Sequence, residues 1–395
     1  MRAAARPQEQ ALLDKARLTE ALALAEQAIG LSDPNPRVGC ILGLGDGTVL
    51  GRGHTQRAGE AHAEVMALRD AASLGHDARG ATAWVTLEPC AHHGRTPPCC
   101  DALIAAGIAR VVIAQLDPFV QVNGQGAARL RAAGVEVIVA DAGSDIALAA
   151  RELNIGFFSR VIRQRPWLRL KIAASLDGRT ALANGRSQWI TGPAARADGH
   201  AWRKRAGATL TGIGTVLEDD PRLDVREVPT VLQPQRVVVD SRLQTPPGAR
   251  ILKPPGGLWI YAGRMIEEAD ARRAALVATG AVAGAVAGAV DIRHLPDAQG
   301  KVDLAAMLTD LAARGINELH VEAGHKLNAS LLQAGLVDEL LVYLAPKLLG
   351  LGREMAAFGP LTELADGLEF RFIEATRIGE DLRLRARPPG RERFI

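Results

Sequence analysis

Three of the four cysteines in this chain lie close to histidines in its first third, and their spacing constrains the fold more than any other feature. The pattern is His62-x-Glu64, then Pro89-Cys90, then Cys99 after eight intervening residues. One imidazole and two thiolates suit zinc, and catalytic zinc sites use three protein ligands and leave one position open to water. We therefore predict that His62, Cys90 and Cys99 bind zinc.

Glu64 is predicted to carry protons rather than to bind the metal. It lies two residues after His62, and residues at that spacing do not share a helix face. The order His-x-Glu, Pro-Cys and a further Cys is the signature of zinc deaminases, in which the glutamate is a general acid and base. That signature has two residues between its cysteines, whereas this chain has eight.

A structural zinc site is the alternative. Such a site has a fourth protein ligand, which His92, His93 or Cys100 can provide. We expect Cys100 to point away from the metal, because it is next to Cys99 on the same predicted helix. Cys40 lies in an apolar strand and is expected to be part of the core.

The composition is that of a globular cytoplasmic protein. A length of 395 residues, 48% of them hydrophobic and 23% charged, predicts two domains with apolar cores. A net charge of +3 and only 7 Phe, 5 Trp and 2 Tyr argue against a nucleic-acid partner. We expect neither a secretory signal nor a membrane span, because no sufficiently long apolar run occurs. Few cysteines, clustered with histidines, indicate a reducing compartment.

The first domain, residues 1–165, is predicted to be an α/β fold in which helices cover a mixed sheet. An amphipathic helix is expected over residues 15–30, and a strand pair around a Gly-Asp-Gly turn follows it. Strands and helices then alternate up to one long closing helix, DIALAARELNIGFFSRVIRQ. A domain boundary is expected near RQRPW, residues 163–167.

The second domain, residues 166–395, is a second α/β domain that ends in a predicted hairpin, LEFRFIEATRIGEDLRLRARP. It has no G-x-G-x-x-G after a strand, so a Rossmann fold is not supported. The stretch ELHVEAGHKLNASLLQAG reads as a strand, a small-residue turn and a helix whose free amides can bind a phosphate. AVAGAVAGAV, residues 281–290, is interpreted as an irregular linker or a weak strand.

Several motifs together resemble the bifunctional deaminase/reductase of riboflavin biosynthesis. They are DPNPRVG, RAGEAHAEV and VTLEPCAHHGRTPPCCDALI in the first domain, and KIAASLDGRTA, SQWITG and VEAG in the second. The resemblance implies a cytidine-deaminase-like three-layer first domain, which uses Zn²⁺ to hydrolyse the exocyclic amine of a diaminohydroxy-phosphoribosylamino-pyrimidine. It implies a dihydrofolate-reductase-like second domain, which uses NADPH to reduce the ribosyl side chain to ribityl.

The same resemblance implies the residues of both sites. The substrate contacts of the deaminase are expected at Asn35, His54, His92 and Arg95. The cofactor contacts of the reductase are expected at Ala173, Trp189, Thr215, Asp219, Ser241, Gly324, His325, Lys326, Leu327, Asn328, Ala329 and Ser330. Its phosphorylated substrate is expected at Ser187, Arg203, Leu223, Arg226 and Glu322, with Lys171 and Asp177 as accessory residues.

Arginine suits phosphate binding, because its guanidinium group offers a planar fork of donors. The alternative for Arg203 is an ordinary solvated helix face, and the alternative for LEDDPR is a turn with an aspartate cap. The chain departs from the resemblance at His325 and Lys326, where the family usually has a small residue or proline. These two side chains either contact the cofactor phosphates or crowd them.

The leading hypothesis is therefore a cytoplasmic enzyme with two consecutive activities, and we expect a homo-oligomer, as in related enzymes. One alternative is a deaminase of free nucleosides or nucleic-acid bases with a non-catalytic second domain. The other is a scaffold protein stabilised by a structural zinc. Glu64 next to three ligands favours an enzyme, because a structural zinc site has no use for a proton carrier.

Overall fold

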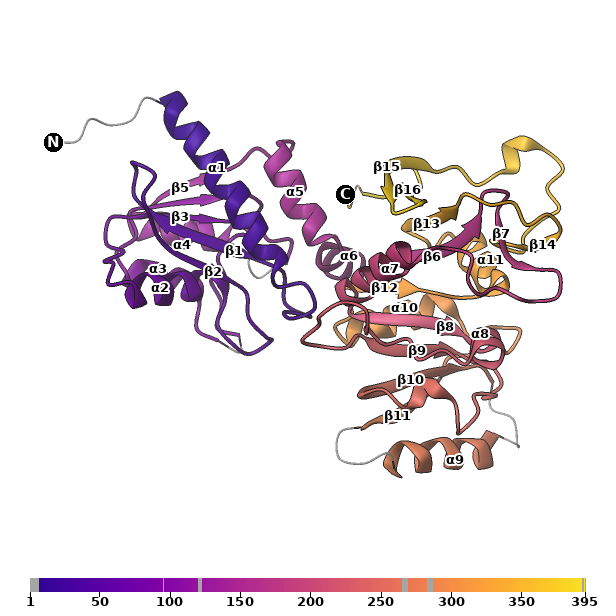
Figure 1. The fold of residues 1–395 in the computed structure, drawn as a ribbon. Helices are drawn as coiled ribbons and strands as arrows, with labels where there is room; N and C mark the ends of the chain where they lie inside the picture. Colours follow the sequence, from indigo (N-terminus) through magenta and orange to yellow (C-terminus); the bar gives the residue numbers. More distant parts are fainter. Residues whose placement is uncertain are drawn as a thin grey trace. The chain divides into compact units, whose positions relative to one another are not determined.

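The structure, a computed structural model, describes residues 7–94, 96–119, 123–264, 269–282, 287–392 and 394. Contacts divide the chain into two compact units, Met1–Arg163 and Gln164–Ile395 (Figure 1). Each unit is built around its own β-sheet. Within the described residues, every helix is too short or too polar to cross a membrane.

The first unit contains a five-stranded mixed sheet of order β2-β1-β3-β4-β5. Strand β1 pairs antiparallel with β2 and β3, whereas β3, β4 and β5 are parallel. The strands are β1 (Gly39–Gly43), β2 (Val49–His54), β3 (Thr82–Val85), β4 (Arg110–Ile113) and β5 (Glu136–Val139). The helices are α1 (Pro7–Glu26), α2 (Ala63–Ser73), α3 (Cys99–Ala105), α4 (Gln125–Ala132), α5 (Asp145–Leu153) and α6 (Ile155–Arg163).

Helices cover both faces of this sheet, which gives the predicted three layers. On one face, Leu18 of α1 packs in a core with Ile41 and Trp84. On the other face, α2 lies so close to β2 that a Cβ on Gly53 would be 2.3 Å from the carbonyl oxygen of Ala63. This close approach fixes the beginning of α2, where the metal-binding pattern starts.

Two helix predictions need correction. The first helix begins at Pro7 and ends at Glu26, earlier at both ends than expected, and proline is favoured in a first helical turn. The single closing helix is in fact two helices, α5 and α6, separated at Asn154. The Asn154 side chain accepts from the Arg37 amide at 2.7 Å and donates to the Arg37 carbonyl at 2.9 Å. These two hydrogen bonds join Asn154 to the residue that lies just before β1, at the point where the helix is interrupted.

The second unit contains a nine-stranded sheet of order β11-β10-β9-β8-β12-β6-β13-β16-β15 and a two-stranded sheet of β14 and β7. Its strands are β6 (Trp167–Ser175), β7 (Arg179–Leu182), β8 (Ala208–Gly212), β9 (Gln235–Val239), β10 (Gly256–Ala262), β11 (Ala287–His294), β12 (Glu318–Val321), β13 (Glu339–Ala345), β14 (Gly352–Glu354), β15 (Arg371–Ile378) and β16 (Asp381–Arg387). Its helices are α7 (Pro193–Arg205), α8 (Ile213–Asp219), α9 (Ala269–Val282), α10 (Leu304–Ala313) and α11 (His325–Gln333), with short 3₁₀ turns at Arg250–Leu252 and Leu364–Asp366.

The predicted C-terminal hairpin is confirmed by the antiparallel pairing of β15 and β16. The Ala/Gly/Val repeat at 281–290 divides between the end of α9 and the start of β11, and its residues 283–286 lie outside the described residues. Four of the ten residues therefore belong to a strand.

The large sheet reverses its strand order between β8 and β12, which are parallel neighbours. From β8 the chain proceeds outward to β9, whereas from β12 it proceeds across β6 to β13. Helices α8 and α11 therefore leave the same edge in different directions. In open α/β sheets, such a switch point at the carboxyl ends of the strands forms a natural ligand crevice.

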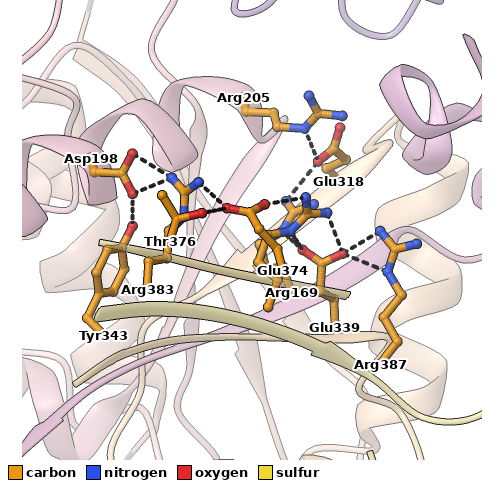
Figure 2. A network of polar contacts seen from close by, with 11 residues as sticks. Arg169, Asp198, Arg205, Glu318, Glu339, Tyr343, Glu374, Thr376, Arg383 and Arg387 are labelled. Atoms are coloured by element: carbon orange, nitrogen blue, oxygen red, sulfur yellow. Dashed lines mark hydrogen bonds and ion pairs between the residues drawn. The ribbon is translucent and has the colours of Figure 1, made fainter. Parts of the chain in front are cut away.

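The two faces of this sheet differ in chemistry. One face carries the apolar core, including Leu170, Leu210 and Val321. Residues alternate between faces along a strand, and over β12, β6 and β13 the opposite face carries charged side chains, whereas over β9 and β10 it carries a second apolar cluster that includes Val238 and Ile260. In the charged part, the fully buried Arg169 donates to Glu339 at 2.7 Å and to Glu318 at 2.8 Å (Figure 2).

Helix α7 lies over this charged face. Asp198 accepts from the Tyr343 hydroxyl at 2.6 Å, and Arg205 donates to Glu318 at 3.0 Å (Figure 2). The Trp202 ring lies 4.4 Å from the guanidinium carbon of Arg169. Residues 198, 202 and 205 share one helix face. Hydrogen bonds and ion pairs therefore hold that face of α7 against the sheet.

Candidate functional site

The three predicted zinc ligands lie together in the first unit. His62 immediately precedes α2, Cys90 follows β3, and Cys99 is the first residue of α3. The Sγ atoms of Cys90 and Cys99 lie 3.7 Å and 3.3 Å from His62 Nδ1, and the three donor atoms are all within 4.8 Å of one another. Within the described ranges, no other His, Cys, Asp or Glu group gathers in this way.

The two thiols of the cluster share one proton. Hydrogen bonding with Cys99 lowers the pKa of the Cys90 thiol to about 4, with burial opposing this shift and His62 assisting it. Within the pair the remaining proton lies on Cys99, whose pKa is raised by its hydrogen bond with Cys90 and by burial. Zinc binds thiolates and neutral imidazoles and releases ligand protons as it binds. One imidazole and two sulfurs that share a single proton therefore fit a catalytic zinc.

Glu64 lies in the first turn of α2 and is only 3% exposed. Burial, together with the negative charge of Cys90, raises the pKa of its carboxyl above the ordinary value. A general acid–base group works best when its pKa approaches the working pH, and this shift is in that direction. Its position beside the cluster, without membership of the cluster, matches the role of a proton carrier.

Cys100 and His92 do not join the cluster. The Cys100 thiol donates to the carbonyl oxygen of Pro89 at 3.3 Å, so it points away from the other two sulfur atoms. The His92 ring lies 6.0 Å from the ring of Phe119. The geometry therefore favours a three-ligand site over a structural site with a fourth protein ligand.

The described substrate contacts that were predicted for the deaminase lie on separate segments of the first unit. His54 ends β2, and its ring lies 3.2 Å from the Gln56 side-chain amide. Asn35 lies in a turn in which its backbone amide donates to the Ser32 carbonyl at 2.9 Å. Arg95 lies outside the described residues.

A cavity of about 860 Å³ opens on the two ligands His62 and Cys99. Its walls also include Gln56 before α2, and Met66 and Arg69 on α2. Sequence reasoning missed these wall residues, although the spacing of 62, 66 and 69 follows one helix face and was a usable signal. Of the described residues, Asn35, His54 and His92 are not among the walls of this cavity.

In the second unit, the predicted phosphate-binding turn lies at the switch point of the sheet. Gly324 immediately precedes α11, and no side chain caps the first turn of this helix. Thr215 of α8 is close by, because a Cβ on Gly324 would lie 3.6 Å from the Thr215 hydroxyl oxygen. Uncapped amides at a helix N-terminus attract anions. This cradle fits the phosphates of a nicotinamide cofactor.

The side chains predicted to bind the cofactor between Gly324 and Ser330 are partly exposed and partly buried. Lys326 is exposed in the first turn, and Ser330 is exposed one turn later with its hydroxyl donating to the Lys326 carbonyl at 3.1 Å. Asn328 and Ala329 are 2% and 3% exposed, and the Asn328 amide donates to the Met355 carbonyl at 2.8 Å. The side chains of Asn328 and Ala329 therefore pack within the protein.

Glu322, which directly follows β12, gathers two other predicted residues. Arg203 donates from two nitrogens to the two carboxylate oxygens of Glu322, and Lys171 Nζ lies 3.5 Å from Glu322 Oε2. Burial favours a higher pKa for Glu322, but Arg203 and Lys171 outweigh burial and hold that pKa well below its ordinary value. Glu322 is therefore ionised and paired.

Asp224 links Arg226 to the same group. Its carbonyl oxygen accepts from Arg203 at 2.9 Å, and its carboxylate accepts from Arg226 at 3.2 Å. The preceding Leu223 has a φ of 53°, a strained value for a residue other than glycine. The strained backbone and the shared aspartate bring two predicted phosphate ligands into one neighbourhood.

Sequence reasoning missed two buried histidines in this neighbourhood. His320 Nε2 lies 3.3 Å from a carboxylate oxygen of Glu322, and His200 Nδ1 accepts from the Arg226 amide at 3.2 Å. Burial, together with Arg203 and Arg226, lowers the pKa of His200 to about 4, so its ring is neutral at pH 7. The alternation of Glu318, His320 and Glu322 along one strand was the available signal for His320.

The other predicted contacts lie on elements around this crevice. Ala173 belongs to β6, Asp219 ends α8, and Ser241 follows β9 with its hydroxyl accepting from the Val302 amide at 3.2 Å. Ser187 is half-buried in the loop after β7, and Trp189 in the same loop is 63% exposed.

Asp177 has a visible structural task. Its carboxylate accepts from the amides of Leu349 and Gly350, at 3.1 Å and 2.8 Å respectively. A hydrogen bond from Ser175, assisted by these amides, lowers the pKa of Asp177 to about 2. This aspartate therefore fixes the loop that follows β13.

Comparisons with known proteins cover both units. The sequence matches the RibD C-terminal domain over residues 166–384 and the cytidine and deoxycytidylate deaminase zinc-binding region over residues 13–115. Riboflavin biosynthesis protein RibD of Escherichia coli (strain K12) is 44% identical over 382 residues, which cover 93% of this chain and 98% of that protein. Its counterpart from Aquifex aeolicus (strain VF5) is 38% identical over 370 residues, with 94% and 97% covered.

Solved structures agree with these matches. The structure of Acinetobacter baumannii RibD has a TM-score of 0.82 at 37% identity and covers 95% of this chain and 99% of its own. A diaminohydroxyphosphoribosylaminopyrimidine deaminase/5-amino-6-(5-phosphoribosylamino)uracil reductase from Thermotoga maritima has a TM-score of 0.81 at 30% identity, with the same coverage.

These likenesses extend through both units, so the predicted order of a cytidine-deaminase-like domain and a reductase domain is confirmed. The alternatives of a deaminase with a non-catalytic second domain and of a zinc-stabilised scaffold are wrong. This chain belongs to the RibD family, the bifunctional riboflavin-biosynthesis enzymes that combine a zinc-dependent deaminase with an NADPH-dependent reductase.

Proposed function

We propose that residues 1–165 carry the deaminase and residues 166–395 carry the reductase of this enzyme. The two sites act in succession on one phosphorylated pyrimidine, first on its exocyclic amine and then on its ribosyl side chain. The observation that supports the assignment most strongly is the buried Glu64 beside His62, Cys90 and Cys99, because it joins a proton carrier to a three-ligand metal site.

In the deaminase, His62, Cys90 and Cys99 hold the zinc. Zinc held there would supply Lewis-acid activation of water, whose pKa catalytic zinc lowers to about 7. Glu64 would take a proton from the attacking water and pass it to the ring nitrogen. It would then pass the proton of the added hydroxyl to the amine, which would leave as ammonia.

In the reductase, the first turn of α11 binds the cofactor phosphates, with Gly324 permitting close approach and Lys326 adding positive charge. Bound NADPH supplies the hydride. Arg203 and Arg226 bind the substrate phosphate, and the ionised Glu322 orients Arg203 for this purpose. Hydride transfer depends more on positioning than on a strong acid or base, which agrees with a site built from paired charges.

Genetic complementation tests this proposal. The gene should restore growth of a bacterial riboflavin auxotroph that lacks both the deaminase and the reductase step. A gene with Glu64→Gln should restore growth only of a strain that lacks the reductase step. A gene with both Arg203→Ala and Arg226→Ala should restore growth more fully in a strain that lacks only the deaminase step than in a strain that lacks only the reductase step. Rescue of the deaminase-deficient strain by Glu64→Gln would contradict the assignment.

We further propose that the enzyme works in the cytoplasm as a homo-oligomer. All four cysteines, including the fully buried Cys40, are free thiols, which suits a reducing compartment. Analytical ultracentrifugation of the purified chain tests the assembly, and a monomer at micromolar concentration would contradict it.

A further inference from the structure

A short segment of the second unit carries Arg226, one of the predicted phosphate ligands, without a helix or strand of its own. The chain from 220 to 234 forms neither, yet Leu223, Asp224 and Val225 are only 3%, 6% and 4% exposed. Buried backbone amides and carbonyls are almost always hydrogen-bonded. The groups that bind this backbone therefore decide where Arg226 lies.

Gln233 binds the middle of the segment through both ends of its side-chain amide. Its side-chain oxygen accepts from the Val225 amide at 2.7 Å, and its side-chain nitrogen donates to the Val225 carbonyl at 2.9 Å. Two such bonds to one residue resemble a hydrogen-bonded pair in an antiparallel sheet. Gln233 thus takes the place of a pairing strand next to Arg226.

Two residues of α7 bind the peptide groups on either side of Val225. Arg203 donates to the Asp224 carbonyl at 2.9 Å, and His200 Nδ1 accepts from the Arg226 amide at 3.2 Å. Residues 200 and 203 lie on the face of α7 opposite to residues 198, 202 and 205, because successive helical residues turn by about 100°. One face of α7 therefore contacts the charged layer, and the other holds the segment.

The His200 ring suits this bond because it is neutral. The side chain is almost fully buried, and burial, together with Arg203 and Arg226, lowers its pKa to about 4. Since Nδ1 accepts a hydrogen bond, the single proton of the neutral ring lies on Nε2, which is 3.7 Å from a carboxylate oxygen of Glu227. At neutral pH the ring thus offers an acceptor to the Arg226 amide.

The Arg226 side chain is oriented but still accessible. The Asp224 carboxylate accepts from its guanidinium group at 3.2 Å, while 45% of the side chain is exposed. Binding a ligand to a group that is already held in place has a lower entropic cost than binding to a mobile one. The bonds to the backbone therefore favour recognition of an anion by Arg226.

We propose that His200 and Gln233 are positioning residues for substrate recognition. They hold the backbone of Arg226 so that its guanidinium group meets the substrate phosphate, without touching substrate or cofactor themselves. This inference rests on the proposed phosphate-binding role of Arg203 and Arg226. It adds the residues through which the reductase distinguishes a phosphorylated substrate from its dephosphorylated form.

Steady-state kinetics of the full-length protein with the deaminated, phosphorylated substrate test the proposal. His200→Leu removes the acceptor, and Gln233→Met keeps the side-chain length but removes both bonds. Each should raise KM roughly three- to thirtyfold, as expected when hydrogen bonds to buried backbone groups are lost. The kcat value and the dissociation constant for NADPH should stay within about twofold.

Two further variants serve as matched controls. His200→Asn should recover most of the lost affinity, because its side-chain oxygen can take the place of Nδ1. Gln299→Met makes the same exchange at an exposed position in another loop of the unit and should leave KM unchanged. NADPH binding verifies that each variant is folded, and since His200 and Gln233 belong to different segments, either one suffices if the other variant does not fold.

Two measurements separate positioning from a general loss of structure. The dephosphorylated substrate should be reduced with the same kcat/KM by wild type, His200→Leu and Gln233→Met, because it lacks the phosphate. In an Arg226→Ala background, each of these two substitutions should add less than about twofold to KM, since both act through Arg226.

Unchanged KM in both His200→Leu and Gln233→Met would overturn the proposal, as would equal losses with the phosphorylated and dephosphorylated substrates or full additivity with Arg226→Ala. A KM for His200→Asn as high as that of His200→Leu would overturn the role of His200 as an acceptor. An unchanged KM in the Arg203→Ala, Arg226→Ala double variant would instead overturn the proposed phosphate site, so the two failures are distinguishable.

Discussion

Arg203 and Glu322 form a two-pronged ion pair that joins the last turn of α7 to the residue after β12. The same arginine also donates to the Asp224 carbonyl, so three of its donor bonds are committed within the protein. A guanidinium group has five N–H donors, which leaves two for a substrate phosphate. The ion pair thus orients the Arg203 guanidinium group and leaves two of its N–H donors available.

Loss of Arg203 should impair the binding of the phosphorylated substrate. Arg203→Ala should raise the KM of the reductase roughly ten- to a hundredfold, because a charged hydrogen-bonded pair contributes about 1.5–3 kcal/mol. Arg203→Lys should recover only part of this loss, because lysine lacks the fork. Steady-state kinetics with the deaminated substrate measure both variants.

The neighbouring Lys204→Ala serves as a control for helix stability. The dissociation constant for NADPH should be unchanged in Arg203→Ala, since the proposed phosphate-binding turn is at Gly324. A similar loss of NADPH affinity would show that Arg203 supports the cofactor site instead.

Zinc content should separate the two adjacent cysteines. Cys99→Ser should lose the metal, because Cys99 Sγ belongs to the three-donor cluster. Cys100→Ser should retain about one zinc per chain, because its thiol is directed to the Pro89 carbonyl. Elemental analysis of the purified variants, with circular dichroism to verify folding, makes this comparison. Equal loss of zinc from both variants would contradict the assigned ligand set.

Glu64→Gln should abolish deamination and leave reduction intact. A positioned acid–base group typically contributes about 10²–10⁴ in rate, and this carboxylate serves several proton transfers. Zinc content should be unchanged because Glu64 is not a ligand. Ammonia release measures the first activity, and the loss of NADPH absorbance with the deaminated substrate measures the second. Ammonia release near the wild-type rate would make the proposed mechanism untenable.

Acid should weaken the second unit through Glu339. Burial raises the pKa of this carboxyl, but Arg169 and Arg385 outweigh burial, so the pKa lies below its usual value of 4.5. Because the folded state holds Glu339 ionised more firmly than the unfolded state does, its stabilising effect is complete above about pH 4.5. The effect is lost progressively as the pH falls towards the lower pKa of the folded state.

Glu339→Gln measures this contribution. At pH 7 the variant should lower the free energy of unfolding by about 3–5 kcal/mol, because it leaves the buried Arg169 short of a partner. The gap between wild type and variant should narrow below about pH 4.5, because the Glu339 carboxyl of the unfolded wild type then takes up a proton. Urea unfolding at pH 7, 4 and 3 supplies the comparison, and an equal gap at all three pH values would contradict the electrostatic explanation.

The sequence predicted the two-domain α/β organisation well, because hydrophobic periodicity and turn residues are local signals. The gathering of His62, Cys90 and Cys99 was predictable, because these residue types have few other reasons to occur at that spacing. The interruption of the helix at Asn154 was not predictable, because it accompanies hydrogen bonds to Arg37, more than a hundred residues earlier in the chain. Long-range pairing of this kind leaves no periodic trace.

The same reason explains the incomplete prediction of the reductase site. Arg203 and Glu322 were found by resemblance, but their direct pairing depends on how β12 and α7 meet. Asp224 and His200 were missed, because a single polar residue in a loop or helix is not distinguishable from a solvated one. Asn328 and Ala329 were expected at the cofactor, yet their side chains face the protein, because only some positions of a helix share a face.

The charged layer beneath α7 has a consequence for how this enzyme tolerates change. Apolar layers accept exchanges of similar volume one residue at a time. In the charged layer, by contrast, Arg169 donates to both Glu339 and Glu318, and Arg383 donates to both Asp198 and Glu374 (Figure 2). A neutral replacement at Asp198 or Glu318 leaves Arg383 or Arg169 with one carboxylate partner fewer, so viable variants should change in matched sets. These bonds fix the position of α7, and therefore of Arg203, relative to the sheet. Homologous domains should therefore differ in their loops before they differ in this layer.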